Sequence, residues 1–163
     1  MPSLHLSTTI NAPIELVFDL ARSIDLHMLS LEHTNERAVA GRMIGLVEKG
    51  ETVTWRAKHL GFTQELTSLI TDVEPHKYFA DQLVKGAFKH FKHEHFFEQQ
   101  EDGSTLMKDI FDYTSPLGVL GKIVDALFLK NYMIRLLEQR NKTLKEVAEN
   151  GTWKELPGME KHL

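Results

Sequence analysis

Cysteine is absent from the 163-residue sequence, and this absence excludes disulfide bonds, thiolate metal sites and cysteine nucleophiles together. The sequence also lacks an apolar run of the ~18 residues that a membrane-spanning helix needs. Its first six residues, MPSLHL, have neither the basic region nor the apolar region of a signal peptide. We therefore expect a cytoplasmic protein without a transmembrane segment.

A surplus of positive charge is lacking as well. The 19 Lys and Arg residues are outnumbered by 23 Asp and Glu residues, which gives a net charge of −4. The most basic stretch, residues 89–93, mixes basic and aromatic side chains, which a strand would send to opposite faces. Nucleic-acid binding requires a clustered basic face, so we expect no nucleic-acid partner.

The composition of the chain is typical of a globular domain. Hydrophobic residues make up 42% of the chain and charged residues 26%, both near globular averages. The length suits one domain with a substantial core. We expect this domain to span residues 1–150 and to be followed by a tail, residues 151–163, whose role the sequence leaves open.

The N-terminal region predicts a strand and two short helices. Residues 3–10 alternate as a strand does, and Pro13 suits the first position of a helix, where its missing N–H costs nothing. The apolar stripe of that helix consists of Ile14, Val17, Phe18 and Ala21. Ser23 is a candidate cap for a second helix that contains His27, for which we expect a solvated or capping role.

From about residue 36 the apolar pattern changes to the two-residue period of strands. Val53, Trp55 and Ala57 alternate with polar neighbours, and Asp102-Gly103 is a strong turn signal. The strands are expected at residues 37–40, 52–59, 62–73, 78–85, 88–99 and 105–114. Short connections between them imply an antiparallel sheet. For residues 78–85, the pattern does not decide which face is inward.

After residues 115–118 the helical period returns and continues to about Asn150, where Gly151 stops it. The apolar face of this helix includes Leu120, Val124 and Phe128. About seven antiparallel strands with a strong twist curl around their apolar face, and this helix is the one element large enough to cover it. Since a helix need not fill a concave sheet, an apolar cavity is expected between them.

The order of these elements and several short segments resemble the SRPBCC or START-like superfamily, which has the α+β helix-grip fold. The segments are residues 10–18 (INAPIELVF), 50–57 (GETVTWRA), 92–97 (KHEHFF), 102–109 (DGSTLMKD) and 115–118 (SPLG). The chain looks most similar to bacterial stand-alone ligand-binding SRPBCC proteins and to polyketide cyclase-like members. The resemblance implies a curved sheet of about seven strands wrapped around a long C-terminal helix.

Three functions are compatible with such a fold. The first is the binding or carrying of a small hydrophobic molecule, lipid-like or aromatic, in the internal cavity. The second is a cyclase or dehydratase that uses His93 or His95 with Asp109, and the third is a structural or partner-binding domain with a filled cavity. The expected ligand contacts are Trp55, His59, Phe62, Phe79, Phe91, His93, His95, Phe97, Asp109, Phe111, Tyr113, Leu120, Val124 and Phe128.

The strand at residues 88–99 carries the most unusual pattern. Phe91, His93, His95 and Phe97 share one face of a strand, and the two phenylalanines indicate that this face is inward. Two histidines at this spacing could bind a metal ion if Asp109 or His59 supplied a third ligand. The sequence has no three-ligand motif, so we expect no metal site and expect instead that both imidazoles hydrogen-bond to buried polar groups or to a ligand.

Asp109 lies in the next expected strand, residues 105–114, which pairs with the strand that carries the two histidines. An inward carboxylate there would need a partner, which His93 or His95 could supply. An Asp–His pair in an apolar pocket is also how a general base is made. No activated serine and no Gly-x-Gly phosphate loop is present, so we expect neither a nucleophilic mechanism nor a cofactor.

Overall fold

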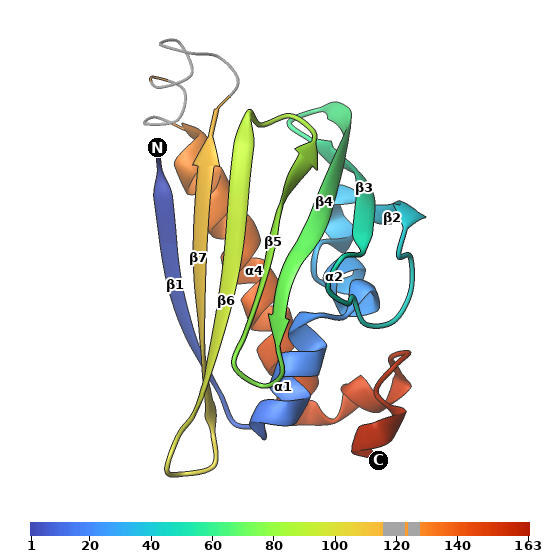
Figure 1. Cartoon of the computed structure of the whole chain (residues 1–163), viewed down its shortest axis with the longest axis vertical. Coiled ribbons are helices and arrows are strands. Elements are labelled where there is room, and N and C mark those ends of the chain that lie inside the picture. The colour runs from blue at the N-terminus through green and yellow to red at the C-terminus, as the bar shows by residue number, and fades with distance from the viewer. Residues whose placement is uncertain (116–122, 124–127) are drawn as a thin grey trace.

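The computed structural model describes residues 1–115, 123 and 128–163 of the chain. Its described residues form one curved, seven-stranded antiparallel sheet with helices on a single face (Figure 1). The strands are β1 (Ser3–Ile10), β2 (Arg37–Gly41), β3 (Thr52–His59), β4 (Phe62–Glu74), β5 (Tyr78–Lys85), β6 (His90–Gln99) and β7 (Thr105–Thr114). This architecture confirms the expected helix-grip fold.

The strand order is β1-β7-β6-β5-β4-β3-β2. Strands β2 to β7 follow one another as a meander, whereas β1 crosses to the far edge and pairs with β7, with Ser3 opposite Asp112. The register between β4 and β5 shifts twice, between Thr67 and Ser68 and between Ile70 and Asp72. Such irregularities bend a strand and increase its twist, which helps β4 to curve around the helices.

Two short helices follow β1. Helix α1 (Ile14–Ala21) begins after Pro13, and helix α2 (Ile24–Ser30) is capped by Ser23, whose Oγ accepts a 3.1 Å hydrogen bond from the backbone N–H of Leu26. The Ser23 cap agrees with the sequence prediction. Both helices pack against the last helix, so the three helices form one layer on the sheet.

Helix α4 (Lys130–Asn150) crosses the concave face of the sheet. It ends at Gly151, which adopts a φ of 82°, a left-handed conformation that glycine takes without strain. Its C-terminal half packs into an apolar core with α1, in which Phe18, Leu144 and Val147 are buried. Its N-terminal half faces a different environment, because the sheet and helix separate there around a cavity.

The segment after α4 folds back onto this core. It forms two 3₁₀ turns, Thr152–Glu155 and Glu160–His162, and buries Trp153 and Met159 beside α1. Lys161 Nζ and His162 Nε2 each lie 2.8 Å from Oδ2 of the buried Asp19 on α1. Residues 151–163 therefore complete the core at this end of the molecule.

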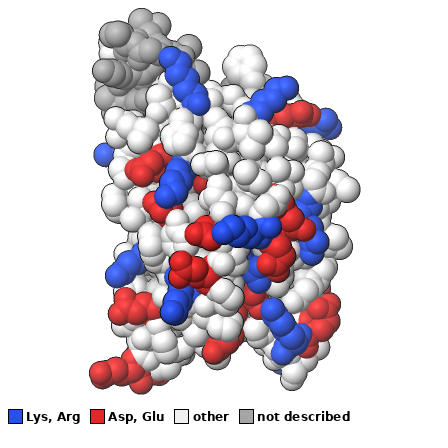
Figure 2. Space-filling model, in the orientation of Figure 1, with Lys and Arg blue, Asp and Glu red and all other residues white. Residues whose placement is uncertain are grey.

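The outer face of the sheet carries charges of both signs, intermixed as Figure 2 shows. Some are paired across neighbouring strands, as in Arg56–Glu65 at 2.6 Å and Lys108–Glu98 at 3.6 Å. Among the described residues, none of the helices has the length and apolar character to cross a bilayer.

Candidate functional site

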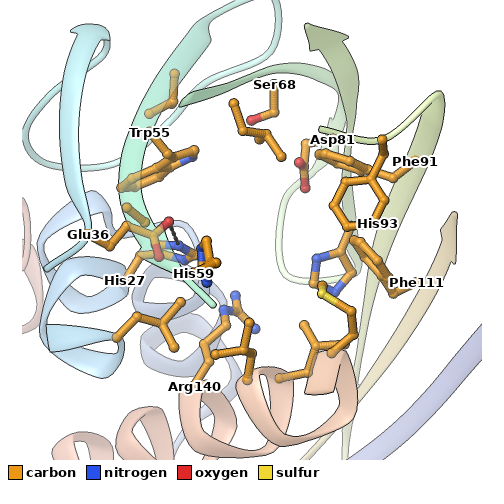
Figure 3. Close-up of a pocket in the computed structure, with 18 of the residues that line it drawn as sticks. His27, Glu36, Trp55, His59, Ser68, Asp81, Phe91, His93, Phe111 and Arg140 are labelled. Carbon is orange, nitrogen blue, oxygen red and sulfur yellow. Dashed lines mark hydrogen bonds and ion pairs between the residues drawn. The ribbon is translucent and has the colours of Figure 1, made fainter. Parts of the chain in front are cut away.

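A cavity of about 450 Å³ lies between the inner face of the sheet and helices α2 and α4 (Figure 3). Most of the side chains around it are apolar or aromatic. They include Val53, Ala57, Leu66, Ile70, Phe79, Phe91, Phe111, Met133 and Leu137. The described side chains thus leave an apolar space of the size range, about 300–1,000 Å³, in which proteins bind small molecules.

Strand alternation explains which residues reach the cavity. On β3, Val53, Trp55 and Ala57 line it while their neighbours point outward, as the sequence pattern predicts. On β6, Phe91, His93, His95 and Phe97 are all buried, which confirms that they share the inward face. On β5 the inward residues are Phe79 and Asp81.

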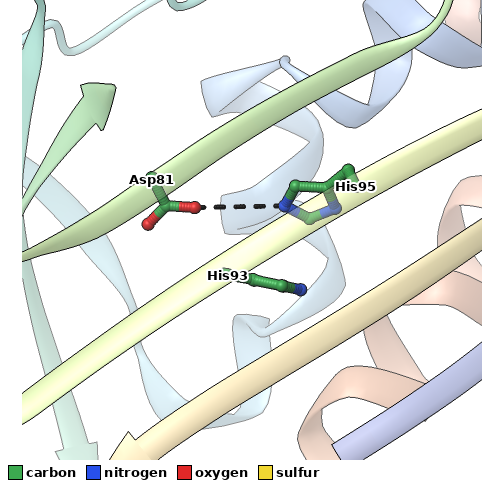
Figure 4. Close-up of side chains that lie close together, drawn as sticks. All are labelled: Asp81, His93 and His95. Carbon is green, nitrogen blue, oxygen red and sulfur yellow. Dashed lines mark ion pairs between the residues drawn. The ribbon is translucent and has the colours of Figure 1, made fainter. Parts of the chain in front are cut away.

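Polar groups gather on one wall of the cavity, where β5 and β6 run side by side. Asp81 of β5 is paired with His93 of β6 in the sheet register, and Oδ1 of Asp81 lies 3.9 Å from Nε2 of His95 (Figure 4). The two imidazole rings are neighbours, with centroids 3.9 Å apart. One carboxylate and two imidazoles are thus concentrated in an otherwise apolar wall.

Asp109 of β7 lies behind the two histidines. Its Oδ1 is 3.2 Å from Nε2 of His93 and 2.7 Å from Nδ1 of His95, and its Oδ2 accepts a 2.6 Å hydrogen bond from Nδ2 of Asn141. Burial alone would raise the pKa of Asp109, but these histidines and the nearby Arg140 guanidinium hold it well below its usual range. Asp109 is therefore a buried, ionised carboxylate whose partners come from sheet and helix.

Burial shifts the pKa values of His95 and Asp81 in opposite directions. Burial lowers the pKa of His95 well below its usual value, and the neighbouring His93 acts in the same direction, so His95 is neutral at pH 7. Burial raises the pKa of Asp81, and its neighbours His93 and Arg140 only partly oppose this. Both pKa shifts favour the uncharged form of the side chain in this apolar wall.

Arg140 enters the cavity from α4 (Figure 3). Its Nη1 donates to Oδ1 of Asn141 at 3.0 Å and lies 3.5 Å from Oδ1 of Asp109, while its Nη2 donates to the backbone carbonyl of Ala21 at 3.0 Å. The guanidinium is thereby held at the junction of α1, α4 and β7, with one face toward the cavity.

A second cluster of polar side chains lies across the cavity from Asp81 and His93, on the side of α2 and β3 (Figure 3). Nε2 of His27 lies 3.1 Å from Oε1 of Glu36, and the His27 ring packs on Trp55 with centroids 4.3 Å apart. His27 lines the cavity with its side chain 28% exposed, so it is partly solvated as expected but is also a wall residue, which the expectation did not include. Nearby, Nδ1 of His59 lies 2.8 Å from the hydroxyl of Tyr132, and burial lowers the pKa of His59.

Seven of the fourteen expected contact residues line the cavity. They are Trp55, His59, Phe79, Phe91, His93, His95 and Phe111. Two more, Leu120 and Val124, lie outside the described residues, as does most of the expected beginning of the last helix.

The structure places the remaining five away from the cavity wall. Phe62 is the first residue of β4, at the hairpin with β3, and is 72% exposed. Phe97 packs edge-on against Phe18 in the core near α1. Tyr113 is enclosed in the cluster around Phe111, Phe128 stacks on Tyr132 at the surface, and Asp109 is screened by the histidines.

Sequence reasoning missed Asp81, Arg140, Glu36 and Tyr132. All four are polar side chains that line the cavity. The two faces of β5 have similar compositions, so alternation alone could not show whether Asp81 points inward. Its pairing with the inward-facing His93 of β6 decides this, because directly paired residues share one face of the sheet. Arg140 and Tyr132 lie on a helix whose polar residues mostly face solvent, so their inward position had no signal of its own.

Comparison with known proteins identifies the fold. TTHA0849 of Thermus thermophilus superposes with a TM-score of 0.75 at 18% identity, over 92% of this chain and 99% of that chain. A START superfamily protein of Mycobacterium smegmatis has a TM-score of 0.68 at 14% identity, over 91% and 97% of the two chains. Major latex-like protein 151 of Panax ginseng has a TM-score of 0.64 at 13% identity, over 90% and 97%.

No family model matches the sequence, and no curated protein is significantly similar to it. The structural similarities extend over nearly the whole of each compared chain. They establish that this chain has the START-like helix-grip fold, as the resemblance in the sequence implied.

Proposed function

We propose that this protein binds a small, largely apolar molecule in the cavity between the sheet and helix α4. The observation that carries the proposal is the cavity itself, about 450 Å³ in volume and lined mainly by apolar and aromatic side chains. A space of this kind with a few convergent polar groups is the usual form of a small-molecule site.

The affinity would come chiefly from apolar burial, at roughly 25 cal/mol for each Å² removed from water. The polar groups would set the orientation. Asp81, His93 and Arg140 line the same cavity, and a buried polar group without a partner costs free energy. We therefore expect a ligand that places a hydroxyl, carbonyl or similar group against this wall and its apolar body toward Trp55 and Phe91.

Native mass spectrometry of freshly purified protein, followed by solvent extraction, tests this proposal. The expected result is a copurified lipid-like or aromatic compound, or, for empty protein, saturable one-to-one binding of the apolar fluorophore anilinonaphthalene sulfonate (ANS). A protein that carries no compound and binds no ANS in a one-to-one ratio would contradict the proposal.

One observation favours a second candidate function, that of a cyclase or dehydratase. Asp109 contacts both His93 and His95, and a carboxylate that orients an imidazole makes a general base. In that case His93→Gln would abolish turnover of a polyketide-like or aromatic substrate and leave ANS binding unchanged. If His93→Gln changes only the thermal stability, the Asp–His arrangement is structural.

A further inference from the structure

Three potential metal ligands converge on the polar wall of the cavity. Asp81, His93 and His95 each offer one ligand atom, and these three atoms all lie within 4.8 Å of one another. We propose that they form a binding site for one divalent first-row transition-metal ion of the zinc type. Metal binding can be measured without any organic ligand, so this inference stands apart from the proposed function.

The distances are close to those of a bound ion. Zinc bonds to imidazole nitrogen at about 2.0–2.1 Å and to carboxylate oxygen at about 2.0–2.2 Å, so tetrahedral ligands lie about 3.3 Å apart. Nε2 of His95 and Oδ1 of Asp81 are 3.9 Å apart in the structure. Shifts on the order of 1 Å in the side chains, including rotation of the Asp81 carboxylate, would bring all three ligand atoms to bonding distance.

Asp109 holds both rings in a way that suits metal binding. An imidazole that binds a metal usually donates its other ring N–H to a carboxylate, which fixes the tautomer and the ring orientation. Asp109 Oδ1 lies 2.7 Å from Nδ1 of His95 and 3.2 Å from Nε2 of His93. His93 Nε2 is in hydrogen-bond geometry with Asp109, which leaves Nδ1 of that ring for an ion. Nδ1 of His95 lies close to Asp109 without a hydrogen bond, so a small rotation of this ring would let it donate to Asp109 and leave Nε2 for the ion.

The structure also selects among the possible third ligands. Asp109 is 1% exposed and already contacts His93, His95, Arg140 and Asn141, so its oxygens are occupied. His59 is engaged by the hydroxyl of Tyr132. Asp81 is the carboxylate that points into the cavity beside the two rings (Figures 3 and 4). Asp81 therefore takes the place of Asp109 and His59, the two residues that the sequence suggested as a possible third ligand.

The charge and the accessibility of the site are compatible with a divalent cation. Arg140, 3.5 Å from Asp109, offsets the charge of that carboxylate, so the charge that Asp81 carries when ionised is left for the ion. Three protein ligands leave at least one coordination position of the ion unfilled by the chain. Since His93 and Asp81 line the cavity, that position would face a water molecule or the polar end of a ligand.

Isothermal titration calorimetry with Zn²⁺, and visible absorption with Co²⁺, test the proposal on untagged, chelator-treated protein. We expect saturable binding of one ion per chain. Asp81→Asn and His93→Gln should each weaken that binding at least about tenfold, because each removes one of three ligands. The matched controls His90→Gln on β6 and Asp112→Asn on the outer face of β7 should bind as the unsubstituted protein does.

A measurement on the unsubstituted chain guards against variants that fail to fold. With histidine labelled by ¹⁵N, the ring signals of two of the nine histidines should shift on addition of one equivalent of Zn²⁺. The proposal is overturned if no saturable one-to-one binding is seen at about 100 μM metal, a concentration of the order that detects weak sites. It is also overturned if Asp81→Asn and His93→Gln bind as the controls do.

Discussion

Nδ2 of Asn141 on α4 donates a 2.6 Å hydrogen bond to Oδ2 of Asp109 on β7. Both side chains are almost fully buried, so the bond joins the helix to the sheet through the interior of the molecule. On its other oxygen, Asp109 contacts His93 and His95. The position of α4 and the orientation of the two imidazoles are therefore linked through one carboxylate.

Removing this amide should destabilise the fold. Asn141→Ala leaves an ionised, buried carboxylate with one donor fewer, and we expect the free energy of unfolding to fall by about 1–3 kcal/mol. Guanidinium unfolding followed by circular dichroism measures the change. The control Gln139→Ala, at an exposed position of α4, should stay within about 0.5 kcal/mol. Equal stabilities of the two variants would show that the bond contributes nothing measurable.

The Asp19 carboxylate should make stability depend on pH. Burial raises its pKa, but hydrogen bonds from Lys161, Arg22 and His162 outweigh burial and lower it. A lowered native pKa means that Asp19 contributes stability in full above its unfolded value, about pH 4, and loses it as the pH falls through the native value. Asp19→Asn should therefore cost about 2–4 kcal/mol at pH 7, and this cost should shrink below about pH 4.

Urea unfolding of the unsubstituted protein and of Asp19→Asn, at intervals from pH 7 to pH 2.5, checks this dependence. Asp112→Asn serves as the comparison, since this substitution removes a carboxylate without affecting the ion pairs that Asp19 makes with Arg22 and Lys161. A difference between the Asp19 variant and the parent that stays constant from pH 7 to pH 2.5 would refute the assigned direction of the pKa shift.

Much of the fold and about half of the site follow from local patterns. The bounds of β3, and the inward face of Phe91, His93 and His95, follow from two-residue alternation because each strand has one clearly apolar face. Asp81 could not be predicted, since both faces of β5 mix apolar and polar residues and its burial depends on pairing with β6. The contacts of Arg140 with Asp109 and Ala21 join positions 31 and 119 residues away, which no local pattern encodes.

Filling the cavity should block ligand binding. Ala57 lines the cavity from β3, whereas its neighbour Lys58 points outward. Ala57→Leu should weaken ANS binding at least about tenfold, which corresponds to about 1.4 kcal/mol. Lys58→Leu adds the same side chain outside the cavity and should leave the affinity unchanged. Fluorescence titration compares the two, and unchanged affinity in Ala57→Leu would place the bound probe elsewhere.

The segment after α4 should contribute to stability through Met159. This side chain is fully buried in the core with α1 and Trp153, so Met159→Ala removes apolar contacts and leaves space behind. We expect a loss of about 2–5 kcal/mol in the free energy of unfolding. Met43→Ala, at a position that is half exposed, is the control and should be nearly neutral. Thermal unfolding of both variants decides whether residues 151–163 belong to the cooperative unit.

The crossing of β1 to the far edge of the sheet has a consequence for the order in which the protein is made. Ser3 pairs with Asp112 and Ile10 with Thr105, so each residue of β1 needs a partner about 100 positions later in the chain. At about 5–20 residues per second, β1 leaves the ribosome about 5–20 s before β7 does. Of the seven strands of this sheet, the one synthesised first is thus among the last to be paired, and it depends on the later strand β7 to cover it.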